Sequence, residues 1–359
     1  MIKKECFTKE WIDQVSTELH YNDKNLIEKV IRALSLLEML VKAGCPLIFK
    51  GGTSLMLIIS KSVHRLSIDI DVICPPGTNI EDYLKEFVDF GFINLELVER
   101  KQRNDANIPK SHSKFFYKIA YRDDTEAQSY ILLDVLYENI HYSRTQQVAI
   151  DSPFISLDGE PLMVTVPSAD DILGDKLTAF APNTTGIPYY KNGKSCSMEI
   201  AKQLFDIGRL FENVTDLQIT STAFHRIAQV ELSYRSLGTN VGQVFNDIRQ
   251  TALCISTRGK AGEGDFDLIQ DGIIRVKSFM YKQRYTIENA IVDSARAAYL
   301  ATLIEKGISE IEPYSNNPAD IKDMIIRPSL SNKLNKLKAN SPEAFYYWAK
   351  TSEILDVQK

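Results

Sequence analysis

The stretch FKGGTSLMLIISKSVHRLSIDIDVI, residues 49–73, places a Gly-Gly pair ahead of two aspartates that stand one residue apart. Asp69 and Asp71 interrupt an apolar run that predicts a buried β-strand. Because side chains alternate along a strand, Ser67, Asp69 and Asp71 share one face. Two like charges on a partly buried face are costly unless they are compensated, and a divalent cation is the usual compensation. The stretch therefore predicts a strand that binds a metal ion.

The residues ahead of this strand predict a phosphate site. Lys50 ends a short predicted strand and is followed by Gly51 and Gly52. Thr53 is then expected to cap a short helix. Glycines let backbone N–H groups approach a phosphate closely, and a helix N-terminus adds partial positive charge. A Gly-Gly pair alone favours a tight turn, but the order of strand, glycines, helix and acidic strand favours phosphate and metal binding together.

A third carboxylate, Asp134, interrupts the apolar strand predicted over Tyr130–Tyr137. Aspartate is depleted in strands and is rarely buried without a partner. Asp134 alone could be an edge-strand residue that caps a neighbouring turn. Together with Asp69 and Asp71 it supplies the three carboxylates that a two-metal phosphoryl-transfer centre needs. We therefore expect these three residues to bind Mg²⁺, with Mn²⁺ as the alternative, and a nucleoside triphosphate (NTP) to be the substrate.

The chain of 359 residues has a formal net charge of −5, with 44% hydrophobic and 25% charged residues. The length suits two domains, or one large domain with a helical extension, and the composition is that of an ordinary globular protein. The net charge gives no sign of general nucleic-acid binding by a basic surface. Helix and strand patterns mix through the first part of the chain, whereas the later pattern is mainly helical. We expect an α+β catalytic domain over residues 1–165 and a mainly α-helical domain over residues 166–359.

The composition also predicts a cytoplasmic protein without a membrane partner. The five cysteines are scattered and show no CxxC spacing, which argues against a disulfide framework or a zinc site. No apolar run approaches the ~18 residues of a membrane span, and the first residues lack the apolar region of a secretory signal. The histidines show no metal-ligand spacing, and no role is predicted for them.

The motifs match a known family. The run KGGTSL over Lys50–Leu55, the run RLSIDID over Arg65–Asp71 and the later Asp134 resemble the AbiEii/AbiGii toxin group of the polymerase-β-like nucleotidyltransferase superfamily. That group shows roughly KGGTxL followed by RxSxDxD. The resemblance covers about residues 30–210 and implies a polymerase-β-like core, which is a mixed sheet flanked by helices.

Two later helical motifs of the group can also be placed. Its helical lysine corresponds to Lys176, and its Arg-Asp-x-x-Asp motif corresponds to Lys202–Asp206, where Lys202 and Gln203 replace the first two residues. The resemblance implies that Lys176 and Asp206 join the three earlier aspartates in catalysis. The residues implied to bind the nucleotide are Lys50, Gly51, Gly52, Thr53, Arg65, Ser67, Lys176 and Lys202.

Lys176 and Asp206 have ordinary explanations as well. Taken alone, Lys176 is a solvated helix lysine, or else a flexible point charge that reaches a triphosphate. Asp206 is a surface i,i+4 partner of Lys202, or else it orients Lys176 or the nucleotide.

One basic stretch with interleaved aromatic residues, RVKSFMYKQR over Arg275–Arg284, bears on the acceptor. Basic side chains that contact phosphates, together with aromatic side chains that stack on bases, would suit RNA. The commoner explanation is the solvated face of an amphipathic helix.

The predicted activity is transfer of a nucleoside monophosphate from an NTP to an acceptor hydroxyl, with release of pyrophosphate. The resemblance implies that the acceptor is RNA, at a tRNA 3′ end, and that the chain is the toxin of a toxin–antitoxin or phage-defence system with a cognate antitoxin. It also implies that the helical domain completes the nucleotide pocket and binds the acceptor. Two alternatives stay open: the same fold acting on a small-molecule or protein hydroxyl, and a catalytically silent nucleotide- or RNA-binding module.

Overall fold

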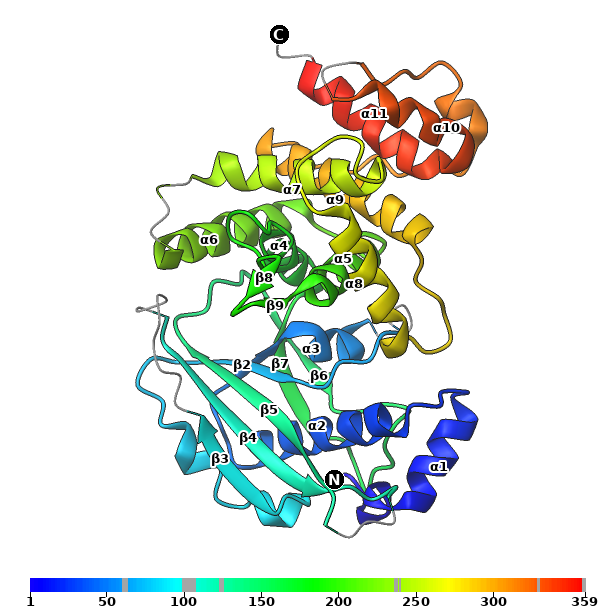
Figure 1. Cartoon of the computed structure of the whole chain (residues 1–359). Coiled ribbons are helices and arrows are strands. Elements are labelled where there is room, and N and C mark those ends of the chain that lie inside the picture. Colours follow the sequence, from blue (N-terminus) through cyan, green and yellow to red (C-terminus); the bar gives the residue numbers. More distant parts are fainter. Residues whose placement is uncertain are drawn as a thin grey trace. The chain divides into compact units, whose positions relative to one another are not determined.

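The computed structural model divides the chain into two compact units (Figure 1). The first unit comprises Met1–Ser168 together with Ser278–Arg284, and the second comprises Ala169–Lys277 and Tyr285–Lys359. The structure describes residues 1–59, 64–98, 108–122, 126–235, 238, 240–327 and 330–356.

The first unit is built on a mixed β-sheet with helices around it. Its helical segments are η1 (Lys4–Phe7), α1 (Lys9–Glu18), α2 (Lys24–Lys42), α3 (Gly51–Ile58), η2 (Ile80–Tyr83) and η3 (Phe87–Phe90). Its strands are β1 (Ile48–Lys50), β2 (Ile70–Cys74), β3 (Asn94–Val98), β4 (Lys110–Lys118), β5 (Gln128–Tyr137), β6 (Thr145–Ala149) and β7 (Met163–Pro167). The first five form one sheet in the order β1-β2-β5-β4-β3, and β6 pairs with β7 separately.

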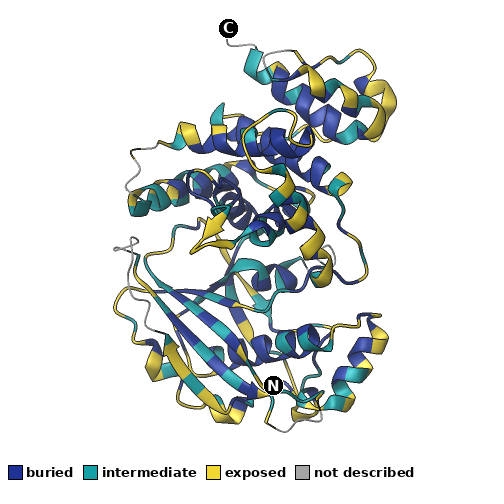
Figure 2. Ribbon diagram, in the orientation of Figure 1, coloured by how far each residue is buried: buried dark blue, intermediate teal, exposed yellow. Residues whose placement is uncertain are grey.

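The sheet brings together strands that are distant in sequence. The neighbours β2 and β5 run parallel, whereas the other neighbouring pairs are antiparallel. Helix α2 packs against both β2 and β5. Alternation along β5 buries Ile131, Leu133 and Val135 and leaves Asp134 half-buried on the opposite face, as the banding of the strand in Figure 2 shows. The apolar face therefore fixes which way the acidic face points.

The second unit is mainly helical. Its elements are α4 (Ala169–Ala179), β8 (Tyr190–Lys191), β9 (Lys194–Ser195), α5 (Ser197–Phe211), α6 (Leu217–Arg235), α7 (Val241–Ser256), α8 (Phe266–Val276), α9 (Ile287–Glu305), η5 (Pro318–Ile321), η6 (Asn332–Lys336), α10 (Leu337–Asn340) and α11 (Pro342–Asp356). Helix α4 packs on α5 and α6, and α9 packs on α5, α7 and α11. The predicted α+β class, with a mixed sheet flanked by helices and a helical C-terminal part, is confirmed.

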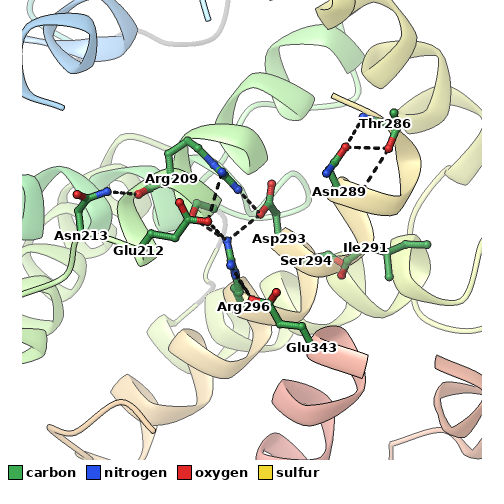
Figure 3. Close-up of polar contacts among 11 residues, drawn as sticks. Arg209, Glu212, Asn213, Thr286, Asn289, Ile291, Asp293, Ser294, Arg296 and Glu343 are labelled. Carbon is green, nitrogen blue, oxygen red and sulfur yellow. Dashed lines mark hydrogen bonds and ion pairs between the residues drawn. The ribbon is translucent and has the colours of Figure 1, made fainter. Parts of the chain in front are cut away.

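A partly buried network of charges joins α5, α9 and α11 in the second unit (Figure 3). Arg296 of α9 lies 2.9 Å from Glu212 and 2.6 Å from Glu343. Its guanidinium and that of Arg209 both lie 3.4 Å from Asp293. Gly208 makes room for this arrangement, because a Cβ atom there would lie 2.0 Å from Asp293 Oδ1. These ion pairs therefore hold α5, α9 and α11 together.

The described helices are all too short or too polar to span a lipid bilayer.

Candidate active site

One row of side chains crosses four strands of the sheet in the first unit. The strand register places Lys50 of β1 opposite Asp71 of β2, Asp71 opposite Asp134 of β5, and Asp134 opposite His112 of β4. Because directly opposed residues of neighbouring strands point to the same face, these four side chains line one face of the sheet. Two carboxylates therefore lie side by side, with a basic residue at each end of the row.

The glycine turn is fitted closely to Asp71. Gly51 has a φ of +82°, which favours glycine, and a Cβ atom there would lie 2.2 Å from Asp71 Oδ2. The Asp71 carboxylate thus occupies the space that any other side chain at position 51 would need. The backbone of the turn and an acidic side chain of β2 are therefore in direct contact, as a joint phosphate and metal site requires.

Thr53 connects the same turn to the exposed Asp69. Its hydroxyl is buried and donates a hydrogen bond to the Asp69 carbonyl oxygen at 2.7 Å. The prediction that Thr53 caps the helix is wrong, because α3 begins at Gly51 and Lys50 occupies the N-cap position. Thr53 instead fixes the backbone of the segment that carries Asp69.

Arg65 and Ser67 converge on the second glycine of the turn. A Cβ atom on Gly52 would lie 2.7 Å from Arg65 Nη2 and 2.8 Å from Ser67 Oγ. The arginine is 2% exposed and donates to the Leu66 carbonyl oxygen at 3.1 Å, whereas Ser67 is half-buried. The KGGT and RxSxDxD motifs are therefore contiguous in space, and their small residues are set by this close packing.

The segment Ser278–Arg284, which we call the strap, pairs with the chain just ahead of Ser67. The Leu66 N–H donates to the Phe279 carbonyl oxygen at 2.8 Å, and the Tyr281 N–H donates to the His64 carbonyl oxygen at 2.9 Å. Arg65 and Met280 form an antiparallel bridge between these two bonds. The strap thus supports the Arg65–Ser67 segment from outside the sheet.

This pairing corrects the amphipathic-helix explanation of the basic stretch and removes one aromatic residue, Tyr281, from the RNA explanation. Helix α8 ends at Val276, so the strap is not part of a single amphipathic helix. Tyr281 is 6% exposed and packs edge-to-face on Phe154 and His64, so it offers no surface for stacking on a base. Lys282 and Arg284 are exposed.

The second unit brings Lys176, Gln203 and Asp206 together where α4 packs on α5. Lys176 Nζ lies 2.9 Å from Asp206 Oδ2 and donates to Gln203 Oε1, also at 2.9 Å. Lys176 is 7% exposed and Asp206 is fully buried, so the solvated lysine and the surface ion pair are both wrong as explanations. Gln203, which stands where the related motif has aspartate, holds the ammonium as a neutral acceptor. Lys202 is half-buried on the same helix.

His112 is a residue that the sequence reasoning missed. Its Nδ1 atom makes a hydrogen bond with Asp134 Oδ1, and the histidine is 6% exposed. Sequence spacing held no signal for this contact, because it arises from the register of β4 on β5 rather than from proximity along the chain.

The donor chemistry of the row suits a hard divalent cation. Asp71 and Asp134 offer carboxylate oxygens from adjacent strands in register, and Mg²⁺ takes few protein ligands because it keeps waters and phosphate oxygens. In the described part of the chain, no three His, Cys, Asp or Glu side chains are gathered into a complete metal site. Metal binding by Asp69, Asp71 and Asp134 therefore stays a prediction.

A comparison with protein-family profiles agrees with the motifs. The profile of the nucleotidyl transferase AbiEii toxin family, of type IV toxin–antitoxin systems, matches residues 34–316. Among solved structures the chain is similar to MenT4, a nucleotidyltransferase toxin from Mycobacterium tuberculosis H37Rv, with 12% identity, a TM-score of 0.45, and coverage of 94% of this chain and 98% of that chain. No curated protein sequence matches. Since the family profile spans most of the sequence, the chain belongs to the AbiEii nucleotidyltransferase toxin family.

Proposed function

We propose that this nucleotidyltransferase toxin transfers a nucleoside monophosphate from an NTP to an RNA hydroxyl, with Mg²⁺ as cofactor and pyrophosphate as leaving group. The observation that carries the proposal is the row of Lys50, Asp71, Asp134 and His112 beside the Gly51–Gly52 turn. A module that only binds anionic nucleotides gains nothing from two adjacent carboxylates, since they repel phosphates unless a cation is bound. The row therefore favours catalysis over silent binding.

The Gly51–Gly52 turn offers hydrogen-bond donors to the triphosphate of the NTP. The N–H groups of Gly51 and Gly52 open helix α3, where backbone donors and the helix dipole favour an anion. Ser67 lies beside them and donates its hydroxyl to a phosphate oxygen. Lys50, at the end of the row, adds a positive charge on the same face.

Asp69, Asp71 and Asp134 would hold the metal ion. When bound, Mg²⁺ supplies charge neutralisation on the phosphate oxygens and makes a nearby hydroxyl more acidic. Asp134 Oδ1 is engaged by His112, which leaves Oδ2 to accept the proton of the acceptor hydroxyl. Displacement at the α-phosphorus then expels pyrophosphate.

The family motif that Lys176 matches supports its role as a further positive charge for the phosphates. Asp206 and Gln203 hold its ammonium group in one place, so that little side-chain entropy is lost when an anion binds. The third ammonium hydrogen is the donor that this role requires.

The acceptor is the part of the proposal that rests on the family alone. Membership in a type IV toxin–antitoxin family supports RNA, with a tRNA 3′ end as the first candidate, and a cognate antitoxin encoded beside the toxin. A small-molecule or protein hydroxyl is the second candidate.

A labelling experiment identifies the acceptor. Each α-³²P-labelled NTP is incubated with the protein, Mg²⁺ and total cellular RNA, and the products are resolved by size before and after nuclease treatment. The proposal expects label in a small RNA, sensitive to nuclease. Label in protein or in small molecules would support the second candidate, and NTP binding without turnover would support the silent module.

A further inference from the structure

A buried histidine at one end of the row has one hydrogen-bond partner within the described part of the chain. His112 hydrogen-bonds Asp134 through Nδ1, whereas among the described residues nothing hydrogen-bonds its buried Nε2 atom. An unsatisfied polar atom inside a protein costs free energy, so it calls for an explanation other than stability. The Asp134 side chain, by contrast, is about one-third exposed, at 32%.

The contact defines where the proton lies. An ionised carboxylate can only accept hydrogen bonds, so His112 Nδ1 must carry the hydrogen and donate it to Asp134 Oδ1. The imidazole is held by β4, whose register with β5 is continuous from Lys110 to Lys118. The donor is therefore fixed by the sheet itself.

A fixed donor matters because the carboxylate of an aspartate turns freely. The terminal torsion of aspartate is broad, and the neighbouring charge of Asp71 favours turning Asp134 away from it. A donor that holds Oδ1 from the β4 side sets the position of Oδ2. Hydrogen bonds from such outer residues tune the affinity of metal-binding carboxylates.

We propose that His112 is a positioning residue that orients the Asp134 carboxylate for the divalent cation and the acceptor hydroxyl. The inference rests on the proposed function and adds His112 to the residues that act in nucleotidyl transfer. The competing explanation is that His112 only fills space between β4 and β5. The two differ in what a smaller donor can restore: asparagine at position 112 keeps an N–H near Nδ1 but not the volume of the ring.

The test compares His112→Ala, His112→Asn and the control His20→Asn, which changes an exposed histidine of the same unit. Binding of Mn²⁺ is measured by electron paramagnetic resonance without NTP, and kcat/KM is measured for transfer. His112→Ala should lose about 10- to 100-fold in both. His112→Asn should recover most of that loss, and His20→Asn should match the wild type. In an Asp134→Ala background, His112→Ala should cause no further loss.

A second measurement does not depend on activity. Nitrogen-15 NMR of histidine-labelled, metal-free protein should show His112 protonated at Nδ1, with the signal assigned by its absence in His112→Asn. The Nε2-protonated tautomer would overturn the inference. So would a His112→Ala variant that keeps its Mn²⁺ affinity and kcat/KM while only its melting temperature falls. If the wild type itself neither binds Mn²⁺ nor transfers nucleotide, the proposed function fails first, which is a distinguishable result.

Discussion

At the scale of single residues, the backbone conformation of Gly51 bears directly on the position of the Asp71 carboxylate. It needs a left-handed backbone, and the Asp71 carboxylate fills the space beside it. Gly77 in the same unit has a similar φ of +86° but no atom within 4 Å of its missing Cβ. Substitutions at both glycines strain the backbone, but only a substitution at Gly51 also displaces Asp71. Comparing them therefore separates the two effects.

We expect Gly77→Ala to lose about 1–2 kcal/mol of stability from the left-handed conformation, and Gly51→Ala to lose at least as much, because its Cβ atom also displaces Asp71. Only Gly51→Ala should also lose transfer activity, by about 10²-fold, because a carboxylate moved by about 1 Å no longer fits its ligand. Denaturant titration and NTP turnover measure the two effects. Equal activity in both variants would show that Asp71 does not need its present position.

At the scale of elements, the site illustrates what sequence patterns can and cannot predict. Local patterns predicted acidic strands at Asp71, from alternation, and at Asp134, from an aspartate that interrupts an apolar run, and both residues lie on strands, β2 and β5. Asp69 was expected on the same strand as Asp71, but β2 begins at Ile70 and Asp69 precedes it. The contact of His112 with Asp134 could not be predicted, since it depends on strand register. The strap was likewise hidden, because it pairs segments that are distant in sequence.

The α4–α5 contact separates two roles of Lys176. If Lys176 only neutralises the buried Asp206, then Lys176→Met combined with Asp206→Asn should restore both stability and activity, since no buried charge remains unpaired. If Lys176 also contacts the phosphates, as we propose, the double variant should fold but lose about 10²-fold in kcat/KM, because that positive charge is gone. Lys336→Met, an exposed position of the same unit, is the matched control. Full activity in the double variant would assign Lys176 a structural role.

The strap offers exposed cations on a segment that supports Arg65. If Lys282 and Arg284 contact RNA phosphates, Lys282→Ala with Arg284→Ala should lower the salt slope of RNA binding by about 0.7–0.9 per lost contact. NTP affinity should not change. The control pair is Lys4→Ala with Lys118→Ala, which removes two exposed charges of the same unit. An unchanged salt slope would place the acceptor on another surface.

At the scale of the whole molecule, the network around Asp293 links the helices of the second unit to pH. Burial raises the pKa of Asp293 to about 6, while Arg209 and Arg296 oppose the rise. The unfolded chain has an ordinary aspartate pKa of about 3.9. Between about pH 4 and about pH 6 the folded protein therefore holds a proton that the unfolded chain has lost, and the unfolding free energy contributed by Asp293 falls as pH rises.

Trp348 makes this measurable, because it is fully buried in the second unit and the sequence holds only one other tryptophan. In a Trp11→Phe background, urea unfolding followed by Trp348 fluorescence should show a stability decrease from about pH 4.5 to about pH 7, on the order of 2 kcal/mol larger than in Asp293→Asn. Subtracting the variant removes the contribution of Asp247, whose pKa burial also raises. A pH dependence that is the same in both proteins would contradict the assignment.

The central claim is that adjacent carboxylates bind a divalent cation for nucleotidyl transfer, and pyrophosphate release tests it most directly. Release from NTP with cellular RNA is compared in Mg²⁺ and in EDTA for the wild type, Asp71→Asn and the exposed control Asp89→Asn. We predict release by the wild type and by Asp89→Asn only with Mg²⁺, and a loss of at least about 10²-fold in Asp71→Asn. In EDTA, Asp71→Asn should melt no lower than the wild type, since one of two like charges is gone. Turnover that persists in EDTA, or that survives Asp71→Asn, would contradict the account.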